Sequence, residues 1–137
     1  MPNCFGFVIL DFDKKNTVLV KTPDGYLSFP KGKFEKKKDL NQLDCALREL
    51  EEETGITPDM ITIVPDIILS ENSKKNICSI QYYVGIIKSS NVVNFVPIDT
   101  EEIVDVKWYE VNKINLLDNL KQSRKDIFND LKQLINL

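Results

Sequence analysis

Residues 48–56 read RELEEETGI, and the short stretch FPKGK precedes them at 29–33. From 40 to 53 apolar residues recur at helical spacing, with Asp39 and Gln42 in capping-box positions and Gly55 just past the end. This pattern predicts a helix with one apolar stripe facing the core, formed by Leu40, Leu43, Leu47 and Leu50.

Four glutamates lie near the end of this helix, and three of them, Glu49, Glu52 and Glu53, share one face away from the apolar stripe. They can be a solvated face with an i,i+4 pair between Arg48 and Glu52. Against this, Glu49 and Glu53 are an i,i+4 pair of like charge, and acids oppose the helix dipole at this end. A bound divalent cation would compensate for both effects. Glu51 points elsewhere and reads as ordinary surface.

The chain has no histidine, which excludes Ser-His-Asp triads, Cys-His pairs and His-ligated zinc within it. Metal chemistry would therefore use oxygen ligands, which favour Mg²⁺ or Mn²⁺. The three cysteines, Cys4, Cys45 and Cys78, are far apart and form no C-x-x-C pair. They indicate a reducing compartment, and we expect a cytoplasmic protein.

The length of 137 residues, with 42% hydrophobic residues, predicts one domain over 1–137. The net charge of −3 does not indicate wholesale nucleic-acid binding. No apolar run approaches the length of a membrane span, and the N-terminal apolar run lacks the basic start of a signal peptide. We expect no membrane partner, and a monomer or small homo-oligomer.

Runs of β-branched and aromatic residues, bounded by polar turns, predict the strands, and KGKFEKKKD at 31–39 is expected to be a lysine-rich loop. A C-terminal helix is predicted at 113–136, with Leu120, Ile127, Leu131 and Leu134 near one stripe. The order of elements predicts a mixed sheet flanked by helices. The predicted strands are 4–12, 17–22, 26–29, 60–71, 77–88, 92–96 and 103–111.

RELEEETGI resembles the second half of the Nudix box, G-x5-E-x7-R-E-U-x-E-E-x-G-U, where U is aliphatic. FPKGK is similar to the usual start of that box. The resemblance implies an α/β fold, a Nudix-type α/β/α sandwich with a mixed β-sheet, a box helix and a C-terminal helix. It also implies a hydrolase that cleaves a nucleoside diphosphate linked to another moiety. The fixed positions are matched by Arg48, Glu49, Leu50, Glu52, Glu53, Gly55 and Ile56.

Carried over by position, the resemblance makes Glu52 and Glu53 principal Mg²⁺ ligands, with Mn²⁺ as an alternative. Glu49 becomes a further ligand or the base that orients water. The backbone carbonyl of Lys31 completes that side of the metal site. Arg48 holds the glutamates in place by ion pairing.

A second acid is expected from the loop before Trp108, and we favour Glu102 over Glu101 as a further ligand or general base. Trp108 itself is expected in the core. Lys31 and Lys33 either contact phosphate oxygens or only keep their loop soluble.

The first half of the box departs from the pattern. Fifteen residues, 33–47, separate Gly32 from Arg48, where the family has thirteen. The box acid falls on Leu40, so Asp39 or Glu35 would have to stand near the missing position. Asp39 is also the predicted N-cap, and this structural role competes with the other one.

The substrate is less clearly indicated. The layout resembles diadenosine tetraphosphate hydrolases first and the catalytic domain of mRNA-decapping enzymes second, so we expect a small nucleotide substrate, with RNA as the alternative. Lys36, Lys37 and Lys38 are the only dense basic run. Tyr82 and Tyr83 must face opposite sides of a strand, so one could stack on a base, or one is core and one is surface. An inositol pyrophosphate or nucleotide sugar substrate, or a Nudix-fold binding module without catalysis, stays open.

Overall fold

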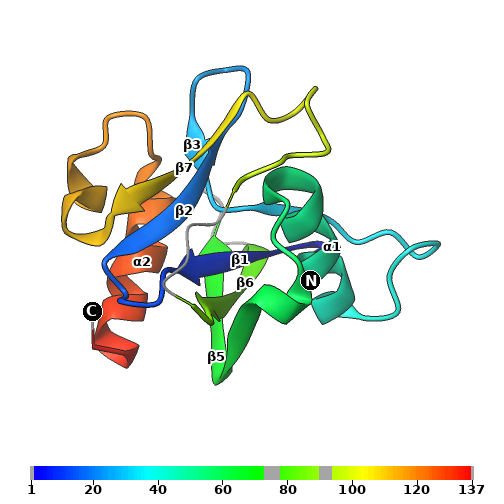
Figure 1. The fold of residues 1–137 in the computed structure, drawn as a ribbon, viewed down its shortest axis with the longest axis horizontal. Helices are drawn as coiled ribbons and strands as arrows, with labels where there is room; N and C mark the ends of the chain where they lie inside the picture. Colours follow the sequence, from blue (N-terminus) through cyan, green and yellow to red (C-terminus); the bar gives the residue numbers. More distant parts are fainter. Residues whose placement is uncertain (1, 73–77, 90–93, 137) are drawn as a thin grey trace.

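The structure, a computed structural model, describes residues 2–72, 78–89 and 94–136 (Figure 1). Two short 3₁₀ helices, Pro58–Met60 and Val111–Leu116, connect the larger elements. The helices are α1 (Gln42–Thr54) and α2 (Gln122–Leu134). The strands are β1 (Cys4–Leu10), β2 (Asn16–Lys21), β3 (Leu27–Ser28), β4 (Lys31–Lys33), β5 (Ile61–Asn72), β6 (Cys78–Ile87) and β7 (Asp105–Glu110).

The seven strands form one mixed sheet in the order β3-β2-β1-β6-β5, with β4 paired to β1 and β7 paired to β2. The β1–β6 pair is parallel, and the other pairs are antiparallel. The two helices lie on opposite sides of this sheet (Figure 1). The predicted fold class, an α/β/α sandwich with a mixed sheet, is confirmed.

Strand β1 shows why both faces of the sheet need a helix. Its alternate side chains Phe5, Phe7 and Ile9 pack in one core cluster with α1, whereas Val8 and Leu10 pack in the other with α2. Such a continuous apolar run is typical of a strand buried on both faces, and each fully buried side chain contributes about 1.5 to 3 kcal/mol of transfer free energy. Among the described residues, no helix is long and apolar enough to cross a membrane.

The start of α1 differs from the prediction. The helix begins at Gln42, and its N-cap is Asn41, whose side chain accepts a hydrogen bond from the amide of Asp44 at 2.9 Å. Leu40 therefore lies before the helix and is 91% exposed, so its assignment to the apolar stripe was wrong. Asp39 is not the N-cap either, because Asn41 occupies that position. The carboxylate of Asp39 binds Arg48 instead, as described below.

Three other elements also differ. KGK at 31–33 is strand β4, paired with Cys4–Gly6 of β1, and not part of a loop. A strand was predicted at 92–96, but residues 94–96 are irregular, and the amide of Val96 donates to the carbonyl of Thr54 at 3.1 Å. Residues 92 and 93 lie outside the described residues. The C-terminal helical region is divided between a 3₁₀ helix and α2, with Leu134 at 58% exposed on the surface.

Candidate active site

Helix α1 presents two glutamates, one turn apart, to strand β4. The carboxylate of Glu53 accepts a hydrogen bond from the backbone amide of Lys31 at 3.1 Å and is only 5% exposed. The carboxyl group of Glu49 lies against Gly32, where an added Cβ would come within 2.1 Å of the carboxyl carbon. A side chain at this position of FPKGK would therefore displace the carboxyl group of Glu49 from the strand.

Arg48 organises the acids around it. Its Nη1 lies 2.9 Å from Glu49 Oε1 and 3.2 Å from Glu52 Oε2, in agreement with the predicted ion pairing. Its Nε and Nη2 bind the two oxygens of Asp39 at 2.8 and 2.9 Å, a bidentate pair, and Glu35 lies 3.5 Å from Nη1. Asp39 and Glu35 thus both reach the arginine from positions near Leu40, where the motif has its acid.

The electrostatics of Glu49 and Glu53 are those of desolvated acids. Burial raises the pKa of Glu53 to about 8, against the opposing hydrogen bond from Lys31. Burial and the neighbouring charge of Glu52 raise the pKa of Glu49 to about 7, although Arg48 acts in the other direction. Burial therefore opposes the ionised form of both carboxyl groups, and a divalent cation beside them would favour it.

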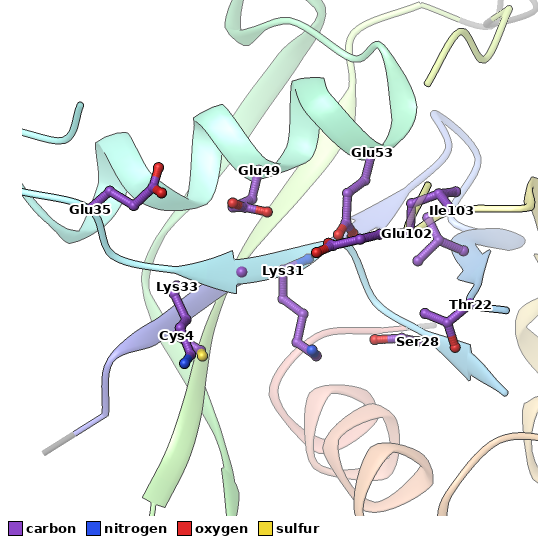
Figure 2. A pocket seen from close by; sticks show the side chains of 12 residues that line it. Cys4, Thr22, Ser28, Lys31, Lys33, Glu35, Glu49, Glu53, Glu102 and Ile103 are labelled. Carbon is purple, nitrogen blue, oxygen red and sulfur yellow. Dashed lines mark hydrogen bonds between the residues drawn. The ribbon is translucent and has the colours of Figure 1, made fainter. Parts of the chain in front are cut away.

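Glu102 approaches from a separate segment. It lines the same cavity as Glu49 and Glu53, and its charge contributes to the raised pKa of both. In Figure 2 its carboxyl group reaches toward β4 beside that of Glu53. Glu101 is not among the residues that line the cavity.

The cavity has a volume of about 510 Å³ and two chemically different sides. The carboxyl groups of Glu49, Glu53 and Glu102 lie on the side of α1, whereas the side chains of Lys31 and Lys33 point away from that helix (Figure 2). Further along, the wall contains residues that sequence reasoning missed, namely Cys4, Val20, Thr22, Ser28 and Ile103. Recognising KGK as a strand paired with β1 would have placed Cys4 opposite Lys33.

The residues fit a hard divalent cation by chemistry, because the donors are carboxylate and backbone oxygens and two of the carboxyl groups are desolvated. Within the part of the chain that the structure describes, no three acidic or cysteine side chains already converge on one point. Glu52 instead lines a neighbouring hollow of about 360 Å³ together with Arg48, Glu49 and Glu102. Of the four glutamates, Glu52 would therefore have to rotate toward β4 in order to join Glu49, Glu53 and Glu102 around one cation.

The structure places neither predicted tyrosine in this cavity. Tyr82 is wholly buried, and its hydroxyl donates to Glu71 Oε1 at 2.8 Å, so the expectation that it contacts substrate was wrong. Tyr83 lies on the opposite face of β6, packs against Phe7 with ring centroids 5.7 Å apart, and lines a different hollow with Leu43. Neither side chain lines the cavity of Glu49, Glu53 and Glu102.

The family model for the NUDIX domain matches residues 2–131 of this chain. The chain therefore belongs to the Nudix family.

Among curated proteins, the chain is 32% identical over 112 residues to the mRNA-decapping enzyme subunit 2 of Saccharomyces cerevisiae (strain YJM789). The match covers 80% of this chain and 11% of the yeast protein, so the chain spans only a small part of that relative's length.

Among solved structures, the chain resembles a C. elegans Ap4A hydrolase in a binary complex, with a TM-score of 0.76 and 20% identity over 96% of each chain. It also resembles a MutT protein from Methanosarcina mazei, with a TM-score of 0.72 and 20% identity over 98% of this chain and 94% of that one. At these sequence identities, the structural similarity shows a shared fold only.

Proposed function

We propose that this Nudix enzyme hydrolyses a polyphosphate bridge between two nucleosides, in a dinucleoside polyphosphate such as diadenosine tetraphosphate. The observation that carries the proposal is the division of charge across β4. Carboxylates suited to a cation lie on one side, and Lys31 and Lys33 lie on the other. A chain of several phosphates would have partners on both sides, since the lysines bind phosphate oxygens that the cation site does not reach.

Glu49, Glu52, Glu53 and Glu102, with the backbone carbonyl of Lys31, would hold Mg²⁺, or Mn²⁺ in its place. When bound, the cation would neutralise the diphosphate and lower the pKa of a water molecule. Arg48 fixes Glu52 and one oxygen of Glu49, which leaves Glu49 Oε2 directed at Gly32.

Glu102 and Glu49 are the candidate general bases that take the proton from the attacking water. Glu102 is exposed, comes from a different segment, and forms none of the ion pairs that hold Glu49 among the described residues. It is therefore the freer of the two to accept and release a proton during turnover.

An RNA cap is the second candidate, because the sequence relative is a decapping enzyme subunit. The corresponding protein of strain S288c is named m7GpppN-mRNA hydrolase, and a cap of this kind contains a triphosphate between two nucleosides. Lys36, Lys37 and Lys38 are exposed next to Glu35 at the rim of the cavity, where an RNA strand could pass.

The test is turnover in Mg²⁺ of diadenosine tetraphosphate, capped RNA, an inositol pyrophosphate and a nucleotide sugar, with the products identified by mass spectrometry. We expect cleavage of diadenosine tetraphosphate. Cleavage of capped RNA alone would support the second candidate, and binding without turnover of any compound would indicate a binding module.

Site variants make the same experiment specific. Glu52→Gln and Glu53→Gln should each lower kcat/KM by at least about a hundredfold, the upper end of the range for outer-shell partners of a metal. Glu51→Gln is the matched control, because it makes the same change of charge on the same helix but lines neither the cavity of Glu49, Glu53 and Glu102 nor the neighbouring hollow of Glu52. Equal activity of all three variants would contradict the assignment of the site.

A further inference from the structure

The segment that carries Glu102 is fastened to the end of α1. The amides of Ile98 and Asp99 both donate to the carbonyl of Glu52, at 2.8 and 3.0 Å, and the amide of Val96 donates to the carbonyl of Thr54 at 3.1 Å. The last carbonyls of a helix have no partner within the helix, so this segment satisfies them. The position of the segment is thereby tied to the helix that carries Glu49 and Glu53.

Gly55 makes this attachment possible. Its φ is 82°, in the left-handed region, and an added Cβ would come within 2.9 Å of the backbone oxygen and 3.0 Å of the backbone nitrogen of Val96. A glycine is therefore needed here both for its conformation and for the close passage of the segment.

Residues 99–103 form a single capped turn. Asp99 Oδ1 accepts a hydrogen bond from the amide of Glu102 at 3.1 Å, and the carbonyl of Asp99 accepts one from the amide of Ile103 at 3.2 Å. These are the bonds of a helix N-cap, with Glu102 at the third position of the turn. Ile103 is buried, and the amide of Val104 donates to the carbonyl of Lys21 on β2 at 2.9 Å, so the far end of the turn is fixed as well.

The sequence D-x-x-E at 99–102 matches a capping box, in which the glutamate would fold back onto the amide of the capping residue. Here that amide is already bound to Glu52. The carboxyl group of Glu102 is consequently directed into the cavity, beside Glu53 (Figure 2).

We propose that Asp99 is a positioning residue, whose side chain sets the turn that directs the Glu102 carboxyl group into the cavity. This inference rests on the proposed role of Glu102 in the hydrolysis. Asp99 acts through its Oδ1 as an acceptor, and its negative charge is not required. Asn has the same acceptor without the charge, and Ala has neither.

The experiment is a double-mutant cycle on Asp99 and Glu102 with the substrate that the parent cleaves. Asp99→Ala should lower kcat about tenfold with little change in KM, the effect of one lost hydrogen bond. Asp99→Asn should stay within about twofold of the parent. The double variant of Asp99→Ala and Glu102→Gln should be no slower than Glu102→Gln alone.

Three kinetic results would overturn the proposal. If Asp99→Asn is as slow as Asp99→Ala, the charge of Asp99 is itself needed. If the effects of Asp99→Ala and Glu102→Gln multiply, Asp99 does not act through Glu102. Full activity of Glu102→Gln would also overturn it, while the proposed reaction would still stand on the Glu52 and Glu53 variants.

Hydrogen exchange of the Glu102 amide, followed by NMR, tests the geometry without a substrate. Exchange should be slow in the parent and in Asp99→Asn, and at least about tenfold faster in Asp99→Ala. Unchanged exchange in Asp99→Ala would overturn the proposal. If the parent cleaves no compound, the proposed function fails, and the exchange result alone decides whether Asp99 fixes the turn.

Discussion

Asp39→Asn should destabilise the protein markedly although it changes only one atom. The side chain of Asp39 is 1% exposed, and both of its oxygens accept bonds from Arg48, at 2.8 and 2.9 Å. The amide group of Asn would turn a donor toward one of the guanidinium donors, so one charge-assisted bond is lost and the charge of Arg48 is less well neutralised. Glu49 and Glu52 remain paired with Arg48 and limit the loss. We expect a decrease of about 2 to 3 kcal/mol in the free energy of unfolding.

The same contact makes stability depend on pH. The hydrogen bond from Arg48 holds the pKa of Asp39 below its ordinary value of 3.8, against its burial. The thiol of Cys45, which also interacts with Asp39, stays protonated in this range of pH, because burial raises its pKa to about 12. A lowered pKa means that the unfolded chain binds the proton more tightly. The stabilisation is therefore complete above pH 3.8 and is lost as the pH falls through the folded-state pKa.

Thermal unfolding followed by circular dichroism measures both effects. At pH 7 the melting temperature of Asp39→Asn should be lower than that of the parent by roughly 6 to 12 °C. The difference between the two proteins should shrink as the pH is lowered below 3.8. Asp130→Asn, on the exposed side of α2, is the control and should melt within a degree or two of the parent, as ordinary surface changes do. Equal melting of Asp39→Asn and Asp130→Asn at pH 7 would refute the reasoning.

Three further predictions follow from the fold and the site. Gly55→Ala should lower the free energy of unfolding by about 1 to 2 kcal/mol because of its φ of 82°, and it should also lower activity because the Cβ displaces the backbone of Val96. Gly25→Ala is the control: its φ is 88° but the space around it is open, so denaturation should show the loss of stability and turnover should be unchanged. Tyr82→Phe should lower the free energy of unfolding by about 1 to 2 kcal/mol through the lost hydrogen bond to Glu71, and kcat/KM should stay unchanged. A changed KM would instead indicate that Tyr82 contacts the substrate. Chelation with EDTA should abolish turnover, and excess Mg²⁺ or Mn²⁺ should restore it, whereas turnover that persists in EDTA would contradict a metal-dependent reaction.

Helical periodicity predicted the centre of the site well. Glu49 and Glu53 are one turn apart, so any helix over this stretch brings them to one face, whatever it packs against. Glu52 was assigned to the same face, and the structure separates it slightly, into the neighbouring hollow beside Arg48. The direction of a long side chain depends on its ion pairs, which the periodicity of the sequence does not encode.

The walls of the cavity could not be predicted in the same way. Cys4 lies in β1, Thr22 directly follows β2 and Ser28 lies in β3, and their meeting depends on the pairing of β4 with β1 and of β3 with β2. Strand β4 consists of three residues, KGK, whose composition does not indicate a strand. It is a strand because it pairs with β1. Long-range pairing of this kind is a property of the fold and not of the local sequence.

The irregular spacing of the box shows how the fold compensates for a change in sequence. The two extra residues before Arg48 move the expected acid position onto Leu40, which the structure leaves 91% exposed before the start of α1. The longer segment between Gly32 and Arg48 contains a bend, in which the amide of Glu35 donates to Asp39 Oδ2 at 2.9 Å. In this bend the carboxylates of Glu35 and Asp39 both lie beside Arg48. Arg48 thus divides its charge among Asp39, Glu35, Glu49 and Glu52. The bend places two acids at the arginine, although the position at which the motif has its acid is occupied by the exposed Leu40.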